Sequence, residues 1–351
     1  MSIGLKEISR LSGVSVGTAS DILNRGQSGL YRADTIERVL SIAKQEGYRA
    51  NRFAQAMRSR KSGIIGFAAA NCTSDGVLDN YNIYPFQVGL NKRLSKAGLH
   101  VGVVELAELD QASPAVPLGL QEQFYSALVV HYGLSPRAMD FARHLGIPLL
   151  WWDSGVFEPS GCLYRDEVRV SRDLTENLIG LGHARIAYMV GESGWRQYQA
   201  GAPAHYSYAQ RYESYRATMK DHGLTEQPVI GYDPESLATQ LAGCDATALI
   251  IQGTNLAMIH APLARLGWRL GERLSVATLD REARIRQIGP VVGGMLYDRF
   301  AAGETAGEMV LASLADTDQL VPSVVLKPQF DVGQTIGKVC KSSKTKKQRK
   351  G

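Results

Sequence analysis

The side chains with the clearest chemical capability are the lysines and arginines near the amino terminus. Residues 1–62 hold 11 basic and 5 acidic side chains, and residues 341–351 hold 6 basic and none acidic. Because the 351-residue chain has a net charge of +5, the residues between these segments carry a net charge of −7. A basic head on an acidic body favours a module that binds a polyanion, with an affinity that falls as salt rises. The side chains expected to face phosphate groups are Lys6, Arg10, Arg25, Arg32, Arg49, Arg52, Arg58 and Arg60.

Three short helices are expected to position these charges. Apolar residues recur at helical spacing over 5–11 and again over 16–24, where Ser15 can cap the amino end. A third helical pattern over 36–43 ends before Gly47. Two helices joined by a short glycine-containing turn, with a third helix after them, are the layout of helix-turn-helix DNA readers, although generic helical pairs share it.

Residues 13–24 contain a specific string, Gly-Val-Ser-x-x-Thr-x-Ser-x-x-x-Asn. Together with the residues that precede it, from Leu5, this string resembles the opening of the LacI family of bacterial repressors. The resemblance covers the chain to about residue 335. It implies an α/β protein with an N-terminal three-helix helix-turn-helix head and two doubly wound parallel-sheet lobes, similar to a periplasmic sugar-binding protein. Further segments that carry the resemblance are Leu181–Tyr188, Arg211–Tyr215 and Leu274–Asp280.

From Gly63 onward, short apolar runs alternate with helical patterns, which predicts parallel α/β lobes. The first series has expected strands at 64–70, 100–105, 127–131 and 147–152, with helices near 86–97 and 139–145. The second series has expected strands at 186–190, 248–252 and 275–279, with helices near 170–181, 211–221 and 256–266.

The resemblance and these patterns together predict a domain organisation. We expect a helix-turn-helix domain over 1–48, a hinge helix or linker over 49–61, a core over 62–337 and a basic disordered tail over 338–351. Three crossovers are expected to join the lobes of the core. The N-lobe is expected at about 62–162 and 285–322, and the C-lobe at about 163–284 and 323–337.

The resemblance places the second helix of the head in the major groove of DNA. Its side chains suit a thymine methyl group, phosphate oxygens and, through Asp21, the N4 amine of cytosine. Another interpretation is open, in which Val16 packs in the core and Asp21 is a solvated surface charge. The expected DNA-binding residues of the head are Val16, Gly17, Thr18, Ser20, Asp21 and Arg25.

Residues 48–61 are basic and rich in small side chains, which is typical of a linker. They also resemble the hinge helix of the same family, which becomes ordered on operator binding and inserts an apolar side chain into the minor groove. Met57 stands where family members usually place leucine, and methionine is among the side chains that separate base steps. The resemblance implies that Asn51, Ala54 and Met57 contact DNA.

Arg211 and Asp280 fall where the family places an arginine and an aspartate that bind the effector between the lobes. A guanidinium can hold a carboxylate or paired hydroxyls, and a carboxylate at the carboxyl end of a strand can accept sugar hydroxyls. The alternative is that the two side chains form a mutual or local ion pair. Phe86, and Trp195 or Tyr198 in a loop of the second lobe, are expected to form an apolar wall for a ring, although such aromatic residues are more often core.

The sequence disfavours several other function classes. The four cysteines are scattered and lack ligand spacing, so we expect no metal, no disulfide framework and no cofactor. No apolar run approaches the roughly 18 to 20 residues of a membrane span and no signal-peptide pattern opens the chain, so we expect a cytoplasmic protein without a membrane partner. No nucleophile elbow, Walker lysine loop or dinucleotide-binding turn follows a strand, and no catalytic residue is assigned.

The sequence therefore predicts a DNA-binding transcriptional regulator, most simply a repressor, that is not an enzyme. We expect it to bind a pseudo-palindromic operator as a homodimer, with a tetramer as the alternative, and to be controlled by a small-molecule effector. A carbohydrate is the first expectation for the effector and a purine-like ring the second. Two other classes stay open: a solute-binding protein without a DNA target, and an α/β enzyme with an accessory DNA module.

Overall fold

The computed structural model divides into two compact units, Met1–Gly63 and Ile64–Gly351. Among the residues that the structure describes, no helix is long and apolar enough to cross a membrane. The predicted hinge and the predicted tail lie almost wholly outside those residues, and the predicted domain boundaries stay predictions. The described residues are 3–24, 28–49, 62–69, 83–105, 120, 124–201, 205–231, 233, 236–252, 257–284 and 289–339.

The described part of the first unit folds into short helices around a small apolar core. Ser15 caps the second helix, as predicted, because its hydroxyl oxygen accepts a hydrogen bond from the amide of Thr18 at 3.0 Å. The core contains Ile8, Ile22 and Val39, whereas Leu40, which the helical pattern places beside them, is exposed. The elements are α1 (Leu5–Ser12), α2 (Val16–Asn24), the 3-10 turn η1 (Ser28–Leu30) and α3 (Ala33–Gln45).

The second unit contains two sheets, each with helices packed on its faces. Lobe 1 has a parallel sheet with the strand order β11-β5-β4-β3-β1-β2. Its strands are β1 (Ile64–Ala69), β2 (His100–Glu105), β3 (Ala127–His131), β4 (Leu149–Trp152), β5 (Cys162–Arg165) and β11 (Val324–Leu326). Its helices are α5 (Ile83–Ser95), α7 (Pro136–Arg143) and α13 (Arg299–Ala315).

Lobe 2 has a second sheet with the strand order β12-β10-β9-β8-β6-β7, in which β12 alone among the described strands runs antiparallel to its neighbour. Its strands are β6 (Ile186–Val190), β7 (Ile230–Gly231), β8 (Ala248–Ile251), β9 (Ser275–Glu282), β10 (Gly293–Tyr297) and β12 (Gln329–Asp331). Its helices are α8 (Glu167–Gly180), α9 (Glu192–Gln199), α10 (Tyr206–Asp221), α11 (Leu237–Gly243) and α12 (Ala257–Arg265).

The chain passes between the lobes at three places in the described residues. Asp166 connects β5 to α8, Asp298 connects β10 to α13, and residues 327–328 connect β11 to β12. Asp166 and Asp298 also cap the helices that they precede, because their carboxylates accept hydrogen bonds from the amides of Arg169 and Ala301. The predicted fold class of a three-helix head and two parallel-sheet lobes is confirmed.

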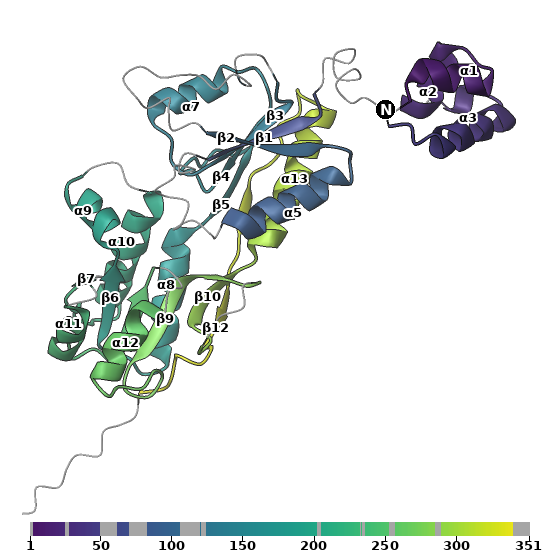
Figure 1. Ribbon diagram of the computed structural model, residues 1–351. Coiled ribbons are helices and arrows are strands. Elements are labelled where there is room, and N and C mark those ends of the chain that lie inside the picture. Colours follow the sequence, from purple (N-terminus) through teal and green to yellow (C-terminus); the bar gives the residue numbers. More distant parts are fainter. Residues whose placement is uncertain are drawn as a thin grey trace, which may run out of the picture. The chain divides into compact units, whose positions relative to one another are not determined.

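Helix α13 returns from lobe 2 and packs along α5 on lobe 1, as Figure 1 shows. Glycines make this close approach possible. A Cβ atom at Gly303 would lie 2.1 Å from the carbonyl oxygen of Phe86, and one at Gly89 would lie 2.0 Å from that of Phe300. The pairing fixes where the second crossover enters lobe 1.

The sequence patterns found most strands and misplaced some helix starts. The strands expected at 100–105, 127–131 and 186–190 have those bounds in the structure. Helix α8 begins three residues before the expected 170, and α10 begins five residues before the expected 211, because polar capping residues extend both helices beyond their apolar pattern. The patterns did not predict β5, β7, β10, β11, β12, α9, α11 or α13.

Candidate functional site at the lobe junction

Seven charged side chains of the described residues gather where the chain crosses between the lobes. They come from the carboxyl ends of β4 and β5, the first residues of α8 and α13, helix α10 and the second half of β9. All are buried or nearly so, and the most exposed side chains among them are 12% accessible. We call this set the junction cluster: Asp153, Arg165, Glu167, Arg211, Asp280, Glu282 and Arg299.

Arg165 is the centre of the junction cluster. Its Nη2 atom lies 2.9 Å from Asp153 Oδ2 and 2.9 Å from Glu167 Oε1, and its Nη1 atom lies 2.9 Å from Asp280 Oδ2. One guanidinium therefore joins a carboxylate of lobe 1, a carboxylate at the first crossover and a carboxylate of lobe 2. Charge-assisted bonds of this kind are strongest where water is excluded.

The other two arginines complete the network. Arg211 donates to both carboxylate oxygens of Glu167, from Nε at 2.7 Å and from Nη2 at 2.8 Å. Its Nη1 atom donates to the carbonyl oxygen of Gln252 at 3.4 Å, and its Nη2 atom lies 3.7 Å from Asp280 Oδ2. Arg299 donates from Nη2 to Asp280 Oδ1 at 2.5 Å. The polar groups of the cluster are thus bonded mainly to one another.

The electrostatics of the cluster follow from burial and close pairing. Burial alone would raise the pKa of the Asp153 and Asp280 carboxyls, yet the nearby Arg165 guanidinium holds both pKa values well below their usual range. Burial alone would lower the pKa of Arg211, but the carboxylates of Glu167 and Asp280 together raise it. Burial raises the pKa of Glu282. With three guanidiniums and four carboxyl groups, the fully ionised cluster has a formal charge of −1.

Aromatic and histidine side chains join the lobes beside the junction cluster. The rings of Tyr132, after β3, and His205, before α10, stack with centroids 4.6 Å apart. His205 Nε2 lies 3.0 Å from the backbone oxygen of Asp153, and the Tyr206 hydroxyl donates to Asp153 Oδ1. Tyr132 has a φ of 74°, which a non-glycine residue rarely adopts, so tertiary contacts hold this backbone.

Two buried hydroxyls at the junction have no hydrogen-bond partner in the described structure. They are Ser154 Oγ, next to Asp153, and Tyr297 Oη, at the end of β10. The ring of Tyr297 lies against two guanidiniums, with the carbon Cζ of Arg165 at 5.0 Å and that of Arg299 at 5.9 Å from its centroid. Buried polar groups nearly always have a hydrogen-bond partner, so these two hydroxyls are exceptions. Each can still form a hydrogen bond.

The structure brings together two of the four residues that the sequence predicted for the effector. Arg211 and Asp280 both belong to the junction cluster, and their contact is the mutual ion pair that was the alternative interpretation. Phe86 is fully buried and stacks on Trp152 in the core of lobe 1. Trp195 lies on helix α9 rather than in a loop, so that expectation was wrong. Effector binding by all four residues stays a prediction.

Trp195 and its neighbours form an aromatic group on lobe 2. Trp195 stacks on Tyr198 with centroids 5.2 Å apart and meets Tyr212 edge-on at 5.0 Å. Tyr198 donates to Glu213, and this bond raises its pKa to about 12. Both α9 side chains are therefore occupied by packing within their own lobe.

Sequence reasoning missed Arg165, Glu167 and Arg299, which make most of the bonds in the junction cluster. Each directly precedes or follows an aspartate that connects the lobes, Asp166 or Asp298. The one available signal was a charged triplet, residues 165–167, between an apolar strand and a helix. Such triplets are usually solvent-exposed, so the signal was weak.

The structure places the predicted DNA-reading residues of α2 on different faces. Val16 and Gly17 are exposed, so Val16 is outside the core, and Thr18 is half-buried. Ser20 is only 4% exposed, and Asp21 accepts a hydrogen bond from the Tyr31 hydroxyl at 2.7 Å. Groove contact stays a prediction for all of them. Outside the described residues lie Arg25, Asn51, Ala54 and Met57.

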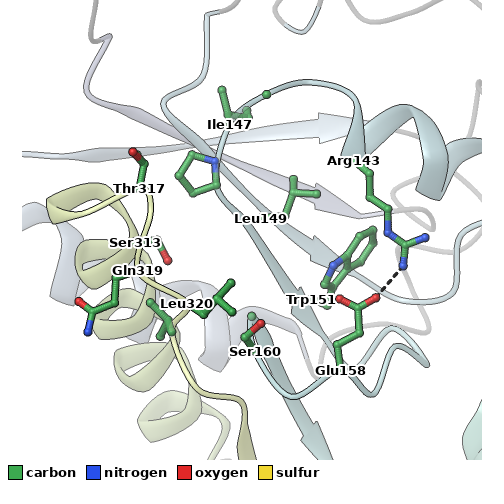
Figure 2. Close-up of a pocket in the computed structure, with 14 residues that line it drawn as sticks. Arg143, Ile147, Leu149, Trp151, Glu158, Ser160, Ser313, Thr317, Gln319 and Leu320 are labelled. Atoms are coloured by element: carbon green, nitrogen blue, oxygen red, sulfur yellow. Dashed lines mark hydrogen bonds and ion pairs between the residues drawn. The ribbon is translucent and has the colours of Figure 1, made fainter.

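A cavity of about 470 Å³ lies at the amino ends of β4 and β5, the sheet edge opposite the junction cluster. Figure 2 shows Arg143 paired with Glu158 at its rim, at 2.8 Å, with Trp151 and Leu320 on its walls. No residue predicted for DNA or effector binding lines this cavity. Within the described part of the chain, no group of three or more potential ligand side chains is arranged to hold a metal ion.

The chain is similar in sequence to a family of binding domains and to known bacterial transcription regulators. The profile of the periplasmic binding protein-like domain matches residues 175–336. The lactose operon repressor of Escherichia coli K12 is 26% identical over 213 residues, which are 56% of this chain and 56% of that repressor. The chain spans about half the length of this and other curated relatives that it matches.

Solved structures extend the likeness to nearly the whole chain. The crystal structure of the lac repressor dimer bound to operator and the anti-inducer ONPF matches with a TM-score of 0.73 and 18% identity, over 95% of this chain and 99% of that one. A complex of the transcriptional regulator CelR with cellobiose matches with a TM-score of 0.60 and 16% identity, over the same shares of each chain. At these identities the likeness shows a shared fold.

Proposed function

We propose that this chain, which belongs to the LacI/GalR family of transcriptional regulators, is a repressor that binds a pseudo-palindromic operator as a homodimer. A small molecule bound between the lobes changes its affinity for DNA. The head of α1 to α3 reads the operator, and lobes 1 and 2 form the receptor for the small molecule. Neither lobe performs catalysis in this proposal.

The observation that carries the proposal is the junction cluster. Arg165 of lobe 1 pairs with Asp280 of lobe 2 at 2.9 Å, and Glu167 at the first crossover binds arginines of both lobes. A ligand that prefers one arrangement of the lobes shifts the population of that arrangement, within the limit set by its difference in affinity. Contacts that cross between lobes are where such a difference in affinity arises.

A carbohydrate is the effector class that we favour, and a purine-like compound is the second choice. Related proteins with this fold include a regulator in complex with cellobiose and a repressor of the lactose operon. The junction also holds two buried hydroxyls without a hydrogen-bond partner in the described structure, Ser154 Oγ and Tyr297 Oη, and hydroxyls of this kind can bond to sugar hydroxyls.

The operator test uses the full-length protein and a library of random DNA duplexes at moderate ionic strength. We expect selection to enrich a site with two symmetric halves, because a homodimer presents two identical heads. Sedimentation of the protein with the enriched duplex gives the number of chains bound. Failure to enrich any symmetric sequence would contradict the proposed repressor and leave a two-lobed receptor.

The proposed minor-groove role of Met57 gives a second test. Met57→Gly removes an apolar side chain that can separate base steps, so binding to the selected operator should weaken by about 1–3 kcal/mol while binding to random DNA stays unchanged. Met57→Leu is the matched control and should keep operator affinity. Equal losses on both kinds of DNA, measured by fluorescence anisotropy at fixed salt, would contradict the wedge role.

A further inference from the structure

The cavity at the amino ends of β4 and β5 has no residue in common with the junction cluster. Its volume of about 470 Å³ falls within the roughly 300–1,000 Å³ that is usual for small-molecule sites. Figure 2 shows Arg143, Trp151 and Glu158 on one side of the cavity and Thr317 and Leu320 on the other. A small molecule therefore has room between the start of β4 and the segment that follows α13.

Apolar side chains form much of the wall of this cavity. Leu320 is 77% exposed, which is more than any other large apolar side chain in the described part of the chain. Covering such surface with an apolar group of a ligand is favourable, because it removes that surface from water. The site therefore favours a ligand with a ring or a branched chain. The apolar residues of the wall are Ile147, Pro148, Leu149, Trp151, Leu320 and Val321.

One cation and one anion stand beside the apolar wall. Among the described residues that line the cavity, Arg143 and Glu158 are the only charged ones. The Arg143 Nη2 atom lies 2.8 Å from Glu158 Oε1, and the guanidinium carbon lies 5.6 Å from the centre of the Trp151 ring. A ligand with a single charge would gain from one of these groups and be repelled by the other. A ligand that carries both charges can pair with both.

The Arg143 pair can open to a ligand at little cost. The two side chains are 43% and 50% exposed, so water already screens their attraction. The backbone of Glu158 is held in place, because its carbonyl oxygen accepts a hydrogen bond from the Ser323 hydroxyl at 2.7 Å. Both charged groups can therefore turn to a ligand without leaving a buried charge unpaired, which no ion pair of the junction cluster could do.

We propose that this cavity is a second small-molecule site and that it binds an apolar α-amino acid. Arg143 binds the carboxylate of the ligand, Glu158 binds its ammonium group, and the side chain of the ligand lies against the apolar wall. An α-amino acid suits the site because its two charged groups and its side chain are attached to one carbon atom. This inference goes beyond the proposed function and does not depend on it.

The test measures binding to the full-length protein by isothermal titration. The probes are L-leucine, L-methionine, L-phenylalanine and L-tryptophan, with glycine as the amino acid that has no side chain. We expect at least one apolar probe to bind, and glycine to bind at least about tenfold more weakly, because glycine covers no apolar surface.

Two analogues of the apolar probe that binds test the charged contacts. Its amide lacks the carboxylate, and the corresponding acid without the amino group lacks the ammonium. Each analogue loses a charge-assisted bond and leaves one charge of the protein without its new partner, so each should bind at least about tenfold more weakly.

The variants Arg143→Met and Glu158→Gln test the same contacts from the side of the protein. Each should weaken amino-acid binding by about tenfold or more, and each should keep a melting temperature close to that of the unchanged protein, because the pair is exposed. Arg216→Met is the matched control and should keep the affinity. The Arg216 side chain is 44% exposed, its Nε atom lies 2.9 Å from Glu226 Oε2, and its guanidinium lies 5.6 Å from the ring of Tyr212 on lobe 2.

Different outcomes overturn different statements. If none of the four apolar probes binds, the cavity is not an amino-acid site. Unchanged affinity in both Arg143→Met and Glu158→Gln, or an equal loss in Arg216→Met, would overturn the assigned contacts. Analogues that bind as tightly as the amino acid itself would overturn the ligand class.

Discussion

The two edges of the lobe 1 sheet carry ion pairs of the same chemical type in opposite settings. At the carboxyl edge, the Arg165 side chain is 7% exposed and contacts three carboxylates. At the amino edge, Arg143 is 43% exposed and pairs with Glu158, which is 50% exposed, across the rim of the cavity in Figure 2. The N–O distances, 2.9 Å and 2.8 Å, are nearly equal.

The two ion pairs therefore differ in burial and not in N–O distance. An exposed pair gains little, because water screens the attraction and two long side chains lose freedom. In a buried network, removing one partner leaves the others as uncompensated charges in a medium that solvates them poorly. We therefore expect that a single substitution destabilises the whole network at the junction, whereas the opposite edge of the sheet tolerates substitution.

Replacing the central cation should have the largest effect. Arg165→Met leaves the carboxylates of Asp153, Glu167 and Asp280 without their shared partner, and we expect the free energy of unfolding to fall by about 3–5 kcal/mol. Urea unfolding of the full-length protein measures this change. Among the described residues Asp153 forms its ion pair with Arg165, whereas Glu167 and Asp280 keep other arginine partners, so adding Asp153→Asn to the variant removes the unpaired charge and should recover part of the loss. A fall of less than about 1 kcal/mol in the free energy of unfolding would contradict the expected difference between the two edges.

The second-largest effect should come from a lower pH, which should reduce the stability of the protein through the junction edge. His131 ends β3 at this edge, and burial lowers its pKa from 6.5 to about 4, although Asp153 opposes the shift. Because the unfolded chain takes up the proton first, the stability due to neutral His131 is complete above pH 6.5 and is lost as the pH falls towards 4. A difference of this size corresponds to about 3 kcal/mol. Other groups that face His131 are His205 and Arg299.

Urea unfolding at intervals from pH 7 to pH 4 tests the acid effect. His131→Phe keeps a ring against Trp152 and cannot take up a proton, so its stability should fall less over this range. Burial also lowers the pKa of His205, which therefore contributes a remaining slope. Because an aspartate in the unfolded chain has a pKa of 3.8, the stability due to ionised Asp153 and Asp280 is lost mainly below the tested range. Parallel pH profiles for the two proteins would rule out His131 as the source.

The exposed edge should show the smallest effect. Arg143→Met breaks the pair with Glu158 and keeps an apolar side chain over Trp151, so the free energy of unfolding should change by about 0–1 kcal/mol. Raising the salt concentration should reduce even this difference. A loss of 3 kcal/mol or more, of the order expected for Arg165→Met, would mean that exposure does not distinguish the pairs.

Local patterns found most of the strands but not the network of ion pairs that joins the lobes. The cap at Ser15 and the strands at 127–131 and 186–190 follow from spacing within a few residues. Family resemblance then located Arg211 and Asp280, which do lie at the junction. Their partners Arg165 and Arg299 were missed, because an arginine beside an aspartate in sequence gives no sign that it is buried.

The sequence by itself determined the three-helix head and the alternation of strands and helices in two lobes, because apolar periodicity and capping act over a single helix or strand. Tertiary structure alone decided which charged groups share the junction. Glu167, Arg211 and Asp280 come from segments more than 40 residues apart, and the packing of α8, α10 and β9 in lobe 2 brings them within bonding distance. The charge balance at that site depends on spatial neighbours, which no local pattern records.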